Sequence, residues 1–228
     1  MKLEGLRILL TGGNGRLGRQ LTNLLWDEGC ILSYPTSKQW DITTTKRPPV
    51  MDTWVPDILI HCAAYTDVPG AETNKGDAVR INVVGTENVV SLAKEVGCRL
   101  IHISSDYVGY RPMGFYATTK MMAEALVPKT ETIIRTSFKD RGTWGENALK
   151  GVFHPVYTNA DWTDIIAKKI IKVIKSDLRG VANVGTKEKT LKDLAVQEYA
   201  DVAEIPVEEA DGMVGYHYPR DCRMKLTI

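Results

Sequence analysis

The residues best suited to proton transfer in this sequence are Tyr116 and Lys120, which stand four positions apart. On a helix this spacing places the phenol and the ammonium one turn apart on the same face. A nearby cation favours the phenolate, so we expect Lys120 to lower the pKa of Tyr116 from its ordinary value of about 10. A tyrosine tuned in this way can deliver or take the proton that accompanies hydride transfer at a carbonyl carbon. A surface pair without chemistry explains the spacing better when the spacing is taken alone.

Ser105 supplies a third group that suits the same chemistry. It follows an apolar stretch over residues 99–104 that we expect to be a strand. A hydroxyl at the carboxyl end of a strand can polarise the oxygen of a substrate carbonyl. Serine is also a common turn or capping residue at such a position. The order along the chain favours the catalytic interpretation, because Ser105 is followed by Tyr116 and Lys120 and preceded by a glycine-rich turn.

The glycine-rich turn follows an apolar run over residues 6–10 and precedes a helical pattern of leucines. In this context the glycines predict dinucleotide binding. Gly12 permits the tight turn, Gly15 lets the backbone approach a pyrophosphate, and Gly18 lets the helix pack on the strand. The free N–H groups at the start of the helix would hold the phosphates. A purely structural turn is the alternative interpretation.

The end of the second expected strand, over residues 30–35, bears on the choice between NAD and NADP. In sites that prefer NAD, an acidic residue about 20 positions past the glycines binds the ribose 2′-hydroxyl. Ser37 and Lys38 occupy this neighbourhood here, and they suit a 2′-phosphate better. We therefore favour NADP(H) over NAD(H), with a solvated turn as the alternative.

Apolar runs alternate with helical patterns along the chain, which predicts an α/β fold with a doubly wound parallel sheet. We expect a nucleotide-binding domain over residues 1–137. Residues 138–228 would form a small, abbreviated substrate region that also contains elements completing the sheet. Further strands are expected over residues 58–62, 132–136 and 181–184. Further helices are expected up to residue 95, and over residues 116–127, 162–175 and 190–199.

The composition excludes several classes of protein. A net charge of +1 offers no electrostatic footprint for nucleic acid or for a membrane surface. The four cysteines are scattered and have no metal-binding spacing, so we expect neither a zinc site nor disulfide bonds. The sequence lacks a signal peptide and an apolar run of about 20 residues that would span a membrane. We expect a cytoplasmic protein without a bound metal.

Seven segments together resemble the dTDP-4-dehydrorhamnose reductases, a family of the extended short-chain dehydrogenase/reductase superfamily. The resemblance covers residues 7–138, and its most specific part is ISSDYV followed by Y-x-x-x-K. It implies a Rossmann-type fold and an NAD(P)-dependent reductase of a nucleotide-linked 4-keto-sugar. The segments are TGGNGRLGRQL, WDIT, PDILIHCAAYTDVPGAE, INVVGTENVVSLAKEVG, HISSDYV, YATTKMMAE and IIRTSF.

The resemblance also assigns roles to individual residues. Tyr116 would be the proton donor, Lys120 the ribose anchor and Ser105 the hydroxyl on the carbonyl. Asp106 and Phe138 would contact the nucleotide-sugar substrate. The remaining cofactor contacts would be Gly15, Arg16 and Leu17 at the pyrophosphate, Asp41 and Ile42 at the adenine, and Ala63, Ala64 and Tyr65 along the groove.

Two departures from the family keep other functions open. Phe138 stands where these reductases usually carry tryptophan, and the loop between Val108 and Tyr116 is shortened to seven residues, GYRPMGF. A non-catalytic regulatory protein that binds a nucleotide or a sugar nucleotide is one alternative. A sugar-nucleotide epimerase or dehydratase is another. The sequence leaves a homodimer open.

Overall fold

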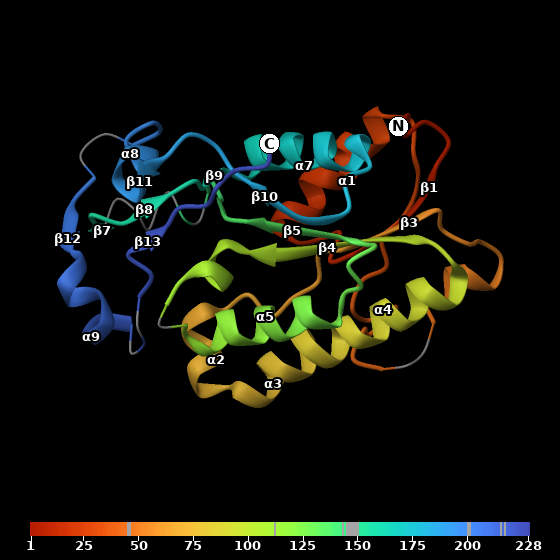
Figure 1. Cartoon of the computed structure of the whole chain (residues 1–228), viewed down its shortest axis with the longest axis horizontal. Coiled ribbons are helices and arrows are strands. Elements are labelled where there is room, and N and C mark those ends of the chain that lie inside the picture. Colours follow the sequence, from red (N-terminus) through yellow and green to blue (C-terminus); the bar gives the residue numbers. More distant parts are fainter. Residues whose placement is uncertain are drawn as a thin grey trace.

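A parallel sheet of six strands forms the centre of the molecule in the computed structural model (Figure 1). The structure describes residues 1–44, 47–111, 113–142, 144, 151–199, 202–214, 216 and 218–228. The strand order is β2-β1-β3-β4-β5-β10. This order confirms the predicted doubly wound α/β fold, in which the chain runs from β1 to one edge and then returns to the other. The strands are β1 (Arg7–Thr11), β2 (Ile31–Ser33), β3 (Ile58–His61), β4 (Arg99–Ser105), β5 (Thr132–Thr136) and β10 (Gly180–Val184).

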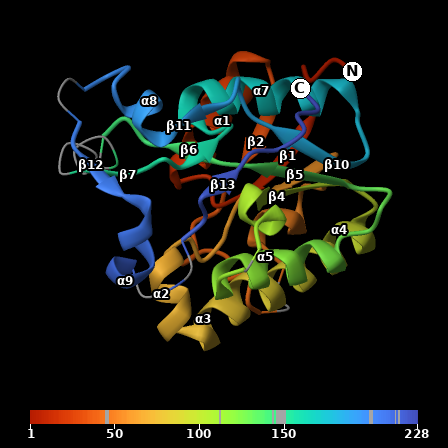
Figure 2. The ribbon, with the colours of Figure 1, turned by 60° about the vertical axis from the view of Figure 1, so that its left-hand side comes forward.

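Helices cover both faces of this sheet, which explains why its central strands are apolar throughout. Helices α1 (Arg16–Asp27) and α7 (Thr163–Ser176) lie on one face, and α4 (Gly85–Val96) and α5 (Phe115–Leu126) lie on the other (Figures 1 and 2). Alternate residues of each strand enter two separate hydrophobic cores. In β1, for example, Ile8 and Leu10 pack toward α1 and α7, whereas Leu9 packs toward α4.

The connection from β3 to α4 contains two short helices and an irregular turn. Helix α2 (Val68–Thr73) and helix α3 (Lys75–Val79) lead into a π-helical segment, Arg80–Val84, which continues as α4. Helix α4 ends at Gly97, whose φ of 70° gives the left-handed C-cap that the sequence predicts. Wide turns of this kind are often found at functional sites.

Most of the region beyond β5 forms short strands beside the carboxyl edge of the large sheet (Figure 1). These strands pair as β6 with β9, β7 with β12, and β11 with β8 and β13. The strands are β6 (Phe138–Lys139), β7 (Val152–His154), β8 (Tyr157–Thr158), β9 (Asp161–Trp162), β11 (Lys189–Thr190), β12 (Glu204–Pro206) and β13 (Asp221–Cys222). The helices are α8 (Leu191–Ala195) and α9 (Ala210–Val214).

Several boundaries differ from those predicted by the sequence. The second strand is shorter, and the helix expected over residues 190–199 ends at Ala195 as α8. Its threonine cap is present, because Thr190 and Asp193 form a reciprocal capping box. Strand β13 lies in a tail that shows no pattern in sequence. Strands of two or three residues carry too few side chains to display a period.

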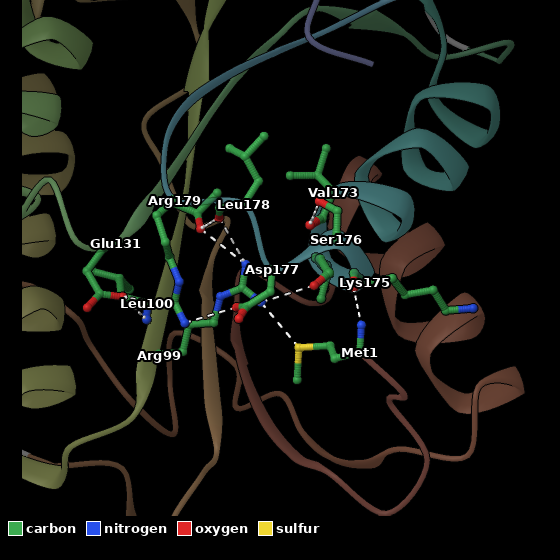
Figure 3. Close-up of polar contacts among 12 residues, drawn as sticks. Met1, Arg99, Leu100, Glu131, Val173, Lys175, Ser176, Asp177, Leu178 and Arg179 are labelled. Atoms are coloured by element: carbon green, nitrogen blue, oxygen red, sulfur yellow. Dashed lines mark hydrogen bonds and ion pairs between the residues drawn. The ribbon is translucent and has the colours of Figure 1, made fainter.

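A polar network fixes the opposite, amino-terminal edge of the sheet (Figure 3). The buried guanidinium of Arg99, at the start of β4, donates to the carbonyl of Ile174 at 3.0 Å and to that of Leu178 at 3.3 Å. It also forms an ion pair with Asp177 at 3.1 Å. These bonds satisfy carbonyls at the end of α7 and hold that helix on the sheet.

No described helix is long and apolar enough to cross a membrane.

Candidate active site

A cleft of about 1280 Å³ opens at the carboxyl ends of β1, β3, β4 and β5. Ligands bind at this edge in open α/β sheets, at the point where the strand order reverses. The predicted site residues that line it are Gly12, Gly15, Arg16, Leu17, Gly18, Ser37, Asp41, Ile42, Ala63, Ala64, Ser105, Tyr116, Lys120 and Phe138. The fold thus brings residues predicted to bind the cofactor and to act in catalysis from distant parts of the sequence into one cavity.

The geometry of the glycine-rich turn fits a dinucleotide. Gly12 has a φ of 69°, and a Cβ there would lie 2.7 Å from the backbone nitrogen of Ala63. A Cβ on Gly18 would lie 2.1 Å from the carbonyl oxygen of Gly12. Gly15 begins α1 without a side-chain cap, so the first N–H groups of the helix have no intrahelical partner. These donors and the helix dipole form an anion site at the wall of the cleft.

Ser105 and Tyr116 meet at the end of the cleft formed by β4 and α5. Both side chains line the cleft, and a hydrogen bond with Ser105 is one of the influences on the Tyr116 phenol. Ser105 Oγ also donates to Asp106 Oδ1 at 3.3 Å and accepts from the backbone N–H of Tyr107 at 3.2 Å. The Tyr107 ring packs edge-to-face on the Tyr116 ring, with centroids 6.3 Å apart. The cleft thus contains two hydroxyl-bearing side chains of the kind that carbonyl chemistry uses.

Lys120 is buried on the predicted face of α5, one turn after Tyr116. Its ammonium donates to the carbonyl oxygen of Ile103 at 2.8 Å. An ammonium has three N–H donors, so two remain for a ligand in the cleft. Burial lowers the pKa of Lys120 to about 8, with Glu124 acting in the opposite direction.

The expected lowering of the Tyr116 pKa is wrong for the protein without ligands. Burial raises the pKa of Tyr116 to about 12, and the nearby Asp106 carboxyl raises it further, while the hydrogen bond with Ser105 lowers it. Burial and the Asp106 carboxyl disfavour the charged phenolate by more than the hydrogen bond with Ser105 favours it. The phenol is therefore fully protonated at neutral pH, which is the state that a proton donor needs.

Two sets of polar contacts hold α5 against the rest of the site. Arg135 of β5 makes a bidentate ion pair with Glu124, at 2.9 Å and 2.6 Å. Asn82, in the π-helical segment, donates to the Thr119 hydroxyl at 2.9 Å. The same side chain accepts from the backbone N–H of Tyr65 at 2.8 Å. The wide turn in the helix thus links the loop after β3 to the helix that carries Tyr116 and Lys120.

His61 extends this link to the glycine-rich turn, and sequence analysis missed its role. The Ala63 N–H donates to the Thr11 hydroxyl at 3.1 Å, and that hydroxyl lies 2.7 Å from His61 Nδ1. His61 Nε2 lies 3.1 Å from the Thr86 hydroxyl, which donates to the carbonyl of Asn82 at 2.6 Å. Consistent donor directions require a neutral imidazole protonated at Nε2. Burial agrees, because it lowers the pKa of His61 to about 3.

Comparison with known families matches residues 6–186 to the model of the RmlD substrate binding domain. The chain belongs to the RmlD family. The match includes the glycine-rich turn, Ser105, Tyr116 and Lys120, so the residues that line the cleft lie inside the family's shared region.

Curated relatives of this RmlD-family chain include two dTDP-4-dehydrorhamnose reductases. The one from Mycobacterium tuberculosis is 34% identical over 164 residues, covering 62% of this chain and 53% of the relative. The one from Aggregatibacter actinomycetemcomitans is 32% identical, covering 72% and 61%. The dTDP-4-keto-6-deoxy-D-glucose reductase of Streptomyces niveus is 28% identical, covering 92% and 84%. The chain spans about half the length of the first of these relatives.

Solved structures share the fold of the RmlD-family chain. The dTDP-4-dehydrorhamnose reductase of Bacillus anthracis in complex with NADP has a TM-score of 0.84 at 24% identity, covering 98% of this chain and 90% of that one. A dTDP-4-dehydrorhamnose reductase from Clostridium acetobutylicum has a TM-score of 0.74 at 26% identity, covering 88% and 83%.

Three of the predicted site residues do not line the cleft of this RmlD-family chain. Lys38 is exposed beyond its rim, Tyr65 is half-buried behind it, and Asp106 is buried beneath Ser105. Phe138 does line the cleft and packs against the core on the α1 side. Among the described residues, no group of three or more His, Cys, Asp or Glu side chains is placed to hold a metal ion.

Asp106 gives this RmlD-family chain a testable pH dependence. Burial raises its pKa to about 7, partly offset by the Lys139 cation, and its Oδ2 makes no hydrogen bond with the residues that the structure describes. Because the folded-state pKa lies above the unfolded one, the folded state binds the proton more tightly. Stability is therefore greatest below about pH 4 for this group and falls as the pH rises toward 7, by up to about 1.4 kcal/mol per pH unit.

Urea unfolding of the wild type and of Asp106→Asn across this pH range tests the assignment. As the pH rises from about 4 to 7, the free energy of unfolding of the wild type should fall relative to that of Asp106→Asn. The difference between the two proteins should level off above pH 7. A constant difference would show that Asp106 keeps an ordinary pKa.

Proposed function

We propose that this chain is an NADP(H)-dependent reductase of a nucleotide-linked 4-keto-sugar. The observation that carries the proposal is the convergence of Ser105, Tyr116 and Lys120 with the glycine-rich turn on one cleft. The family membership and the reductase activities for which the curated relatives are named support it. In this arrangement residues 1–137 hold the cofactor. Residues 138–228, beginning with Phe138, contact the substrate.

The residues of the chain divide the chemistry among them. A nicotinamide dinucleotide bound along the glycine-rich turn supplies a hydride for the ketone carbon. Tyr116 gives its phenolic proton to the carbonyl oxygen, and the Ser105 hydroxyl turns from Asp106 to donate its single proton in a hydrogen bond to the same oxygen. The Lys120 ammonium uses its two remaining donors on ribose hydroxyls and keeps a positive charge beside the developing phenolate. The raised pKa of Tyr116 ensures that the proton is present at neutral pH.

A preference for NADP(H) over NAD(H) is part of the proposal. The B. anthracis neighbour was solved with NADP, and an RMD structure from Pseudomonas aeruginosa was solved with NADPH. The RMD structure has a TM-score of 0.71 at 19% identity, covering 89% of this chain and 87% of that one. Ser37 lines the cleft in the loop after β2, and no acidic residue stands between it and Trp40. A neutral hydroxyl admits a 2′-phosphate that a carboxylate would repel.

Ser37→Asp should therefore weaken NADPH binding at least about 10-fold relative to NADH, because a carboxylate repels the phosphate and accepts from a ribose 2′-hydroxyl. Calorimetric titration of both cofactors measures the ratio. Lys38→Asp at the exposed neighbouring position is the matched control, with a smaller change expected. An unchanged ratio in Ser37→Asp would place the 2′-phosphate elsewhere.

The activity is tested by mixing the protein with NADPH and dTDP-4-dehydrorhamnose and following the absorbance of the reduced nicotinamide. Consumption of NADPH with formation of the reduced sugar is the expected result. Product without net consumption would instead indicate an epimerase or dehydratase. Cofactor binding without any turnover over a panel of nucleotide keto-sugars would indicate the regulatory alternative, which the seven-residue loop before Tyr116 favours.

A further inference from the structure

Two cations that line the cleft form no ion pair with any residue that the structure describes. Arg16 lies in the first turn of α1, and Lys139 lies in β6, directly after Phe138. Both side chains line the cavity. Neither charged group makes a hydrogen bond or an ion pair within the part of the chain that the structure describes. In a water-filled cleft, two such cations close together attract an anion of more than one charge.

The position of Lys139 is fixed by its surroundings. Its residue pairs with Trp162 in the β6–β9 ladder, and its carbonyl accepts from the Thr163 hydroxyl at 3.0 Å. Its ammonium lies 5.4 Å from the centroid of the Trp144 ring, a cation–π contact. The half-buried stem is thus held while the N–H donors stay available to a ligand.

Among the described residues, the cation–π contact with Trp144 is the one that positions the Lys139 ammonium. The Asp106 carboxyl attracts the ammonium electrostatically, but the two groups do not form an ion pair. Burial lowers the pKa of Lys139, and the charge of Arg16 lowers it further, so the two cations are close enough to repel each other. Both side chains line the same cavity, which agrees with this repulsion.

We propose that Arg16 and Lys139 form a cationic clamp that binds a diphosphate group in the cleft. The inference rests on the proposed function, because that function brings two diphosphates to this cavity. One is the pyrophosphate of the dinucleotide, and the other joins the nucleoside to the sugar of the substrate. Arg16 approaches from the glycine-rich turn and Lys139 from the end of β5, so a diphosphate between them would be held from two sides.

Lys139 gives the more specific test, because it belongs to β6 and is not part of the glycine-rich turn. Binding of NADPH and of dTDP, each alone, is measured by calorimetry for the wild type, Lys139→Met and Lys139→Arg. Methionine keeps an unbranched apolar stem for the Trp144 ring but removes the charge. Lys94→Met, at an exposed position of α4 outside the cleft, is the matched control.

We expect Lys139→Met to weaken at least one of the two ligands by about 10-fold or more, since charge-assisted hydrogen bonds to phosphate are lost. Lys139→Arg and Lys94→Met should remain near the wild-type affinity. An effect confined to NADPH identifies the cofactor pyrophosphate as the bound group. An effect confined to dTDP identifies the diphosphate of the sugar nucleotide.

Unchanged affinity for both ligands in Lys139→Met would overturn the clamp and leave the proposed function intact. A wild-type protein that binds neither ligand would overturn both. Thermal unfolding checks that each variant is folded, and Lys139→Gln replaces the methionine variant if that one unfolds. Raising the salt concentration should weaken the wild type more than Lys139→Met, which a role of Lys139 in packing alone would not produce.

Discussion

Replacing Tyr116 with phenylalanine is expected to lower turnover by about 10²–10⁴-fold, the usual contribution of a general acid. The substitution removes the phenolic proton and leaves the ring packed edge-to-face against Tyr107. Cofactor affinity should stay largely intact, because the hydroxyl acts mainly in the transition state. Steady-state kinetics with NADPH and a nucleotide keto-sugar, together with calorimetric binding of NADPH, measure the two effects.

Tyr110→Phe is the matched control for this experiment. The Tyr110 hydroxyl donates to the carbonyl of Tyr218 at 3.1 Å and is not among the groups lining the cleft. Its loss should change stability more than turnover. Undiminished turnover of Tyr116→Phe on a true substrate would rule out Tyr116 as the proton donor.

Replacing Gly15 with leucine is expected to abolish measurable dinucleotide binding while the protein stays folded. Gly15 is exposed at the start of α1, and a Cβ there would meet only the carbonyl oxygen of Gly12, at 3.1 Å. The added side chain would occupy the space through which a pyrophosphate reaches the free N–H groups of the helix. Calorimetry with NADPH measures the affinity, and thermal unfolding measures the fold.

Gly18→Ala and Gly109→Ala provide the contrast. A Cβ on Gly18 would lie 2.1 Å from the Gly12 carbonyl oxygen, so this variant should lose stability as well as affinity. A Cβ on Gly109 would meet nothing within 4 Å, so that variant should resemble the wild type. Wild-type affinity for NADPH in Gly15→Leu would show that the turn does not bind a dinucleotide.

The parts of this protein that could be predicted from sequence are those governed by local patterns. Continuous apolar runs over residues 58–62 and 99–104 predict buried parallel strands, and β3 and β4 lie there. The spacing of Tyr116 and Lys120 predicts a shared helix face, and α5 provides it. The glycine spacing predicts a tight turn, and Gly12 has the positive φ that such a turn requires.

The parts that could not be predicted depend on contacts between distant residues. The raised pKa of Tyr116 follows from burial in the assembled cleft, which the neighbouring lysine in the sequence does not reveal. The role of His61 depends on hydroxyls from Thr11 and Thr86, which lie 50 and 25 positions away. Lys139 faces the cleft because β6 pairs with β9, a ladder of two residues without a sequence signal.

The most direct test of the central claim follows the hydride itself. NADPH deuterated at both positions of nicotinamide C4 is mixed with the protein and dTDP-4-dehydrorhamnose, and the product is analysed by mass spectrometry and NMR. The proposed function predicts deuterium at C4 of the sugar, with one NADPH oxidised for each sugar reduced. A protein that binds both ligands but transfers no deuterium to this or any other nucleotide keto-sugar would contradict it.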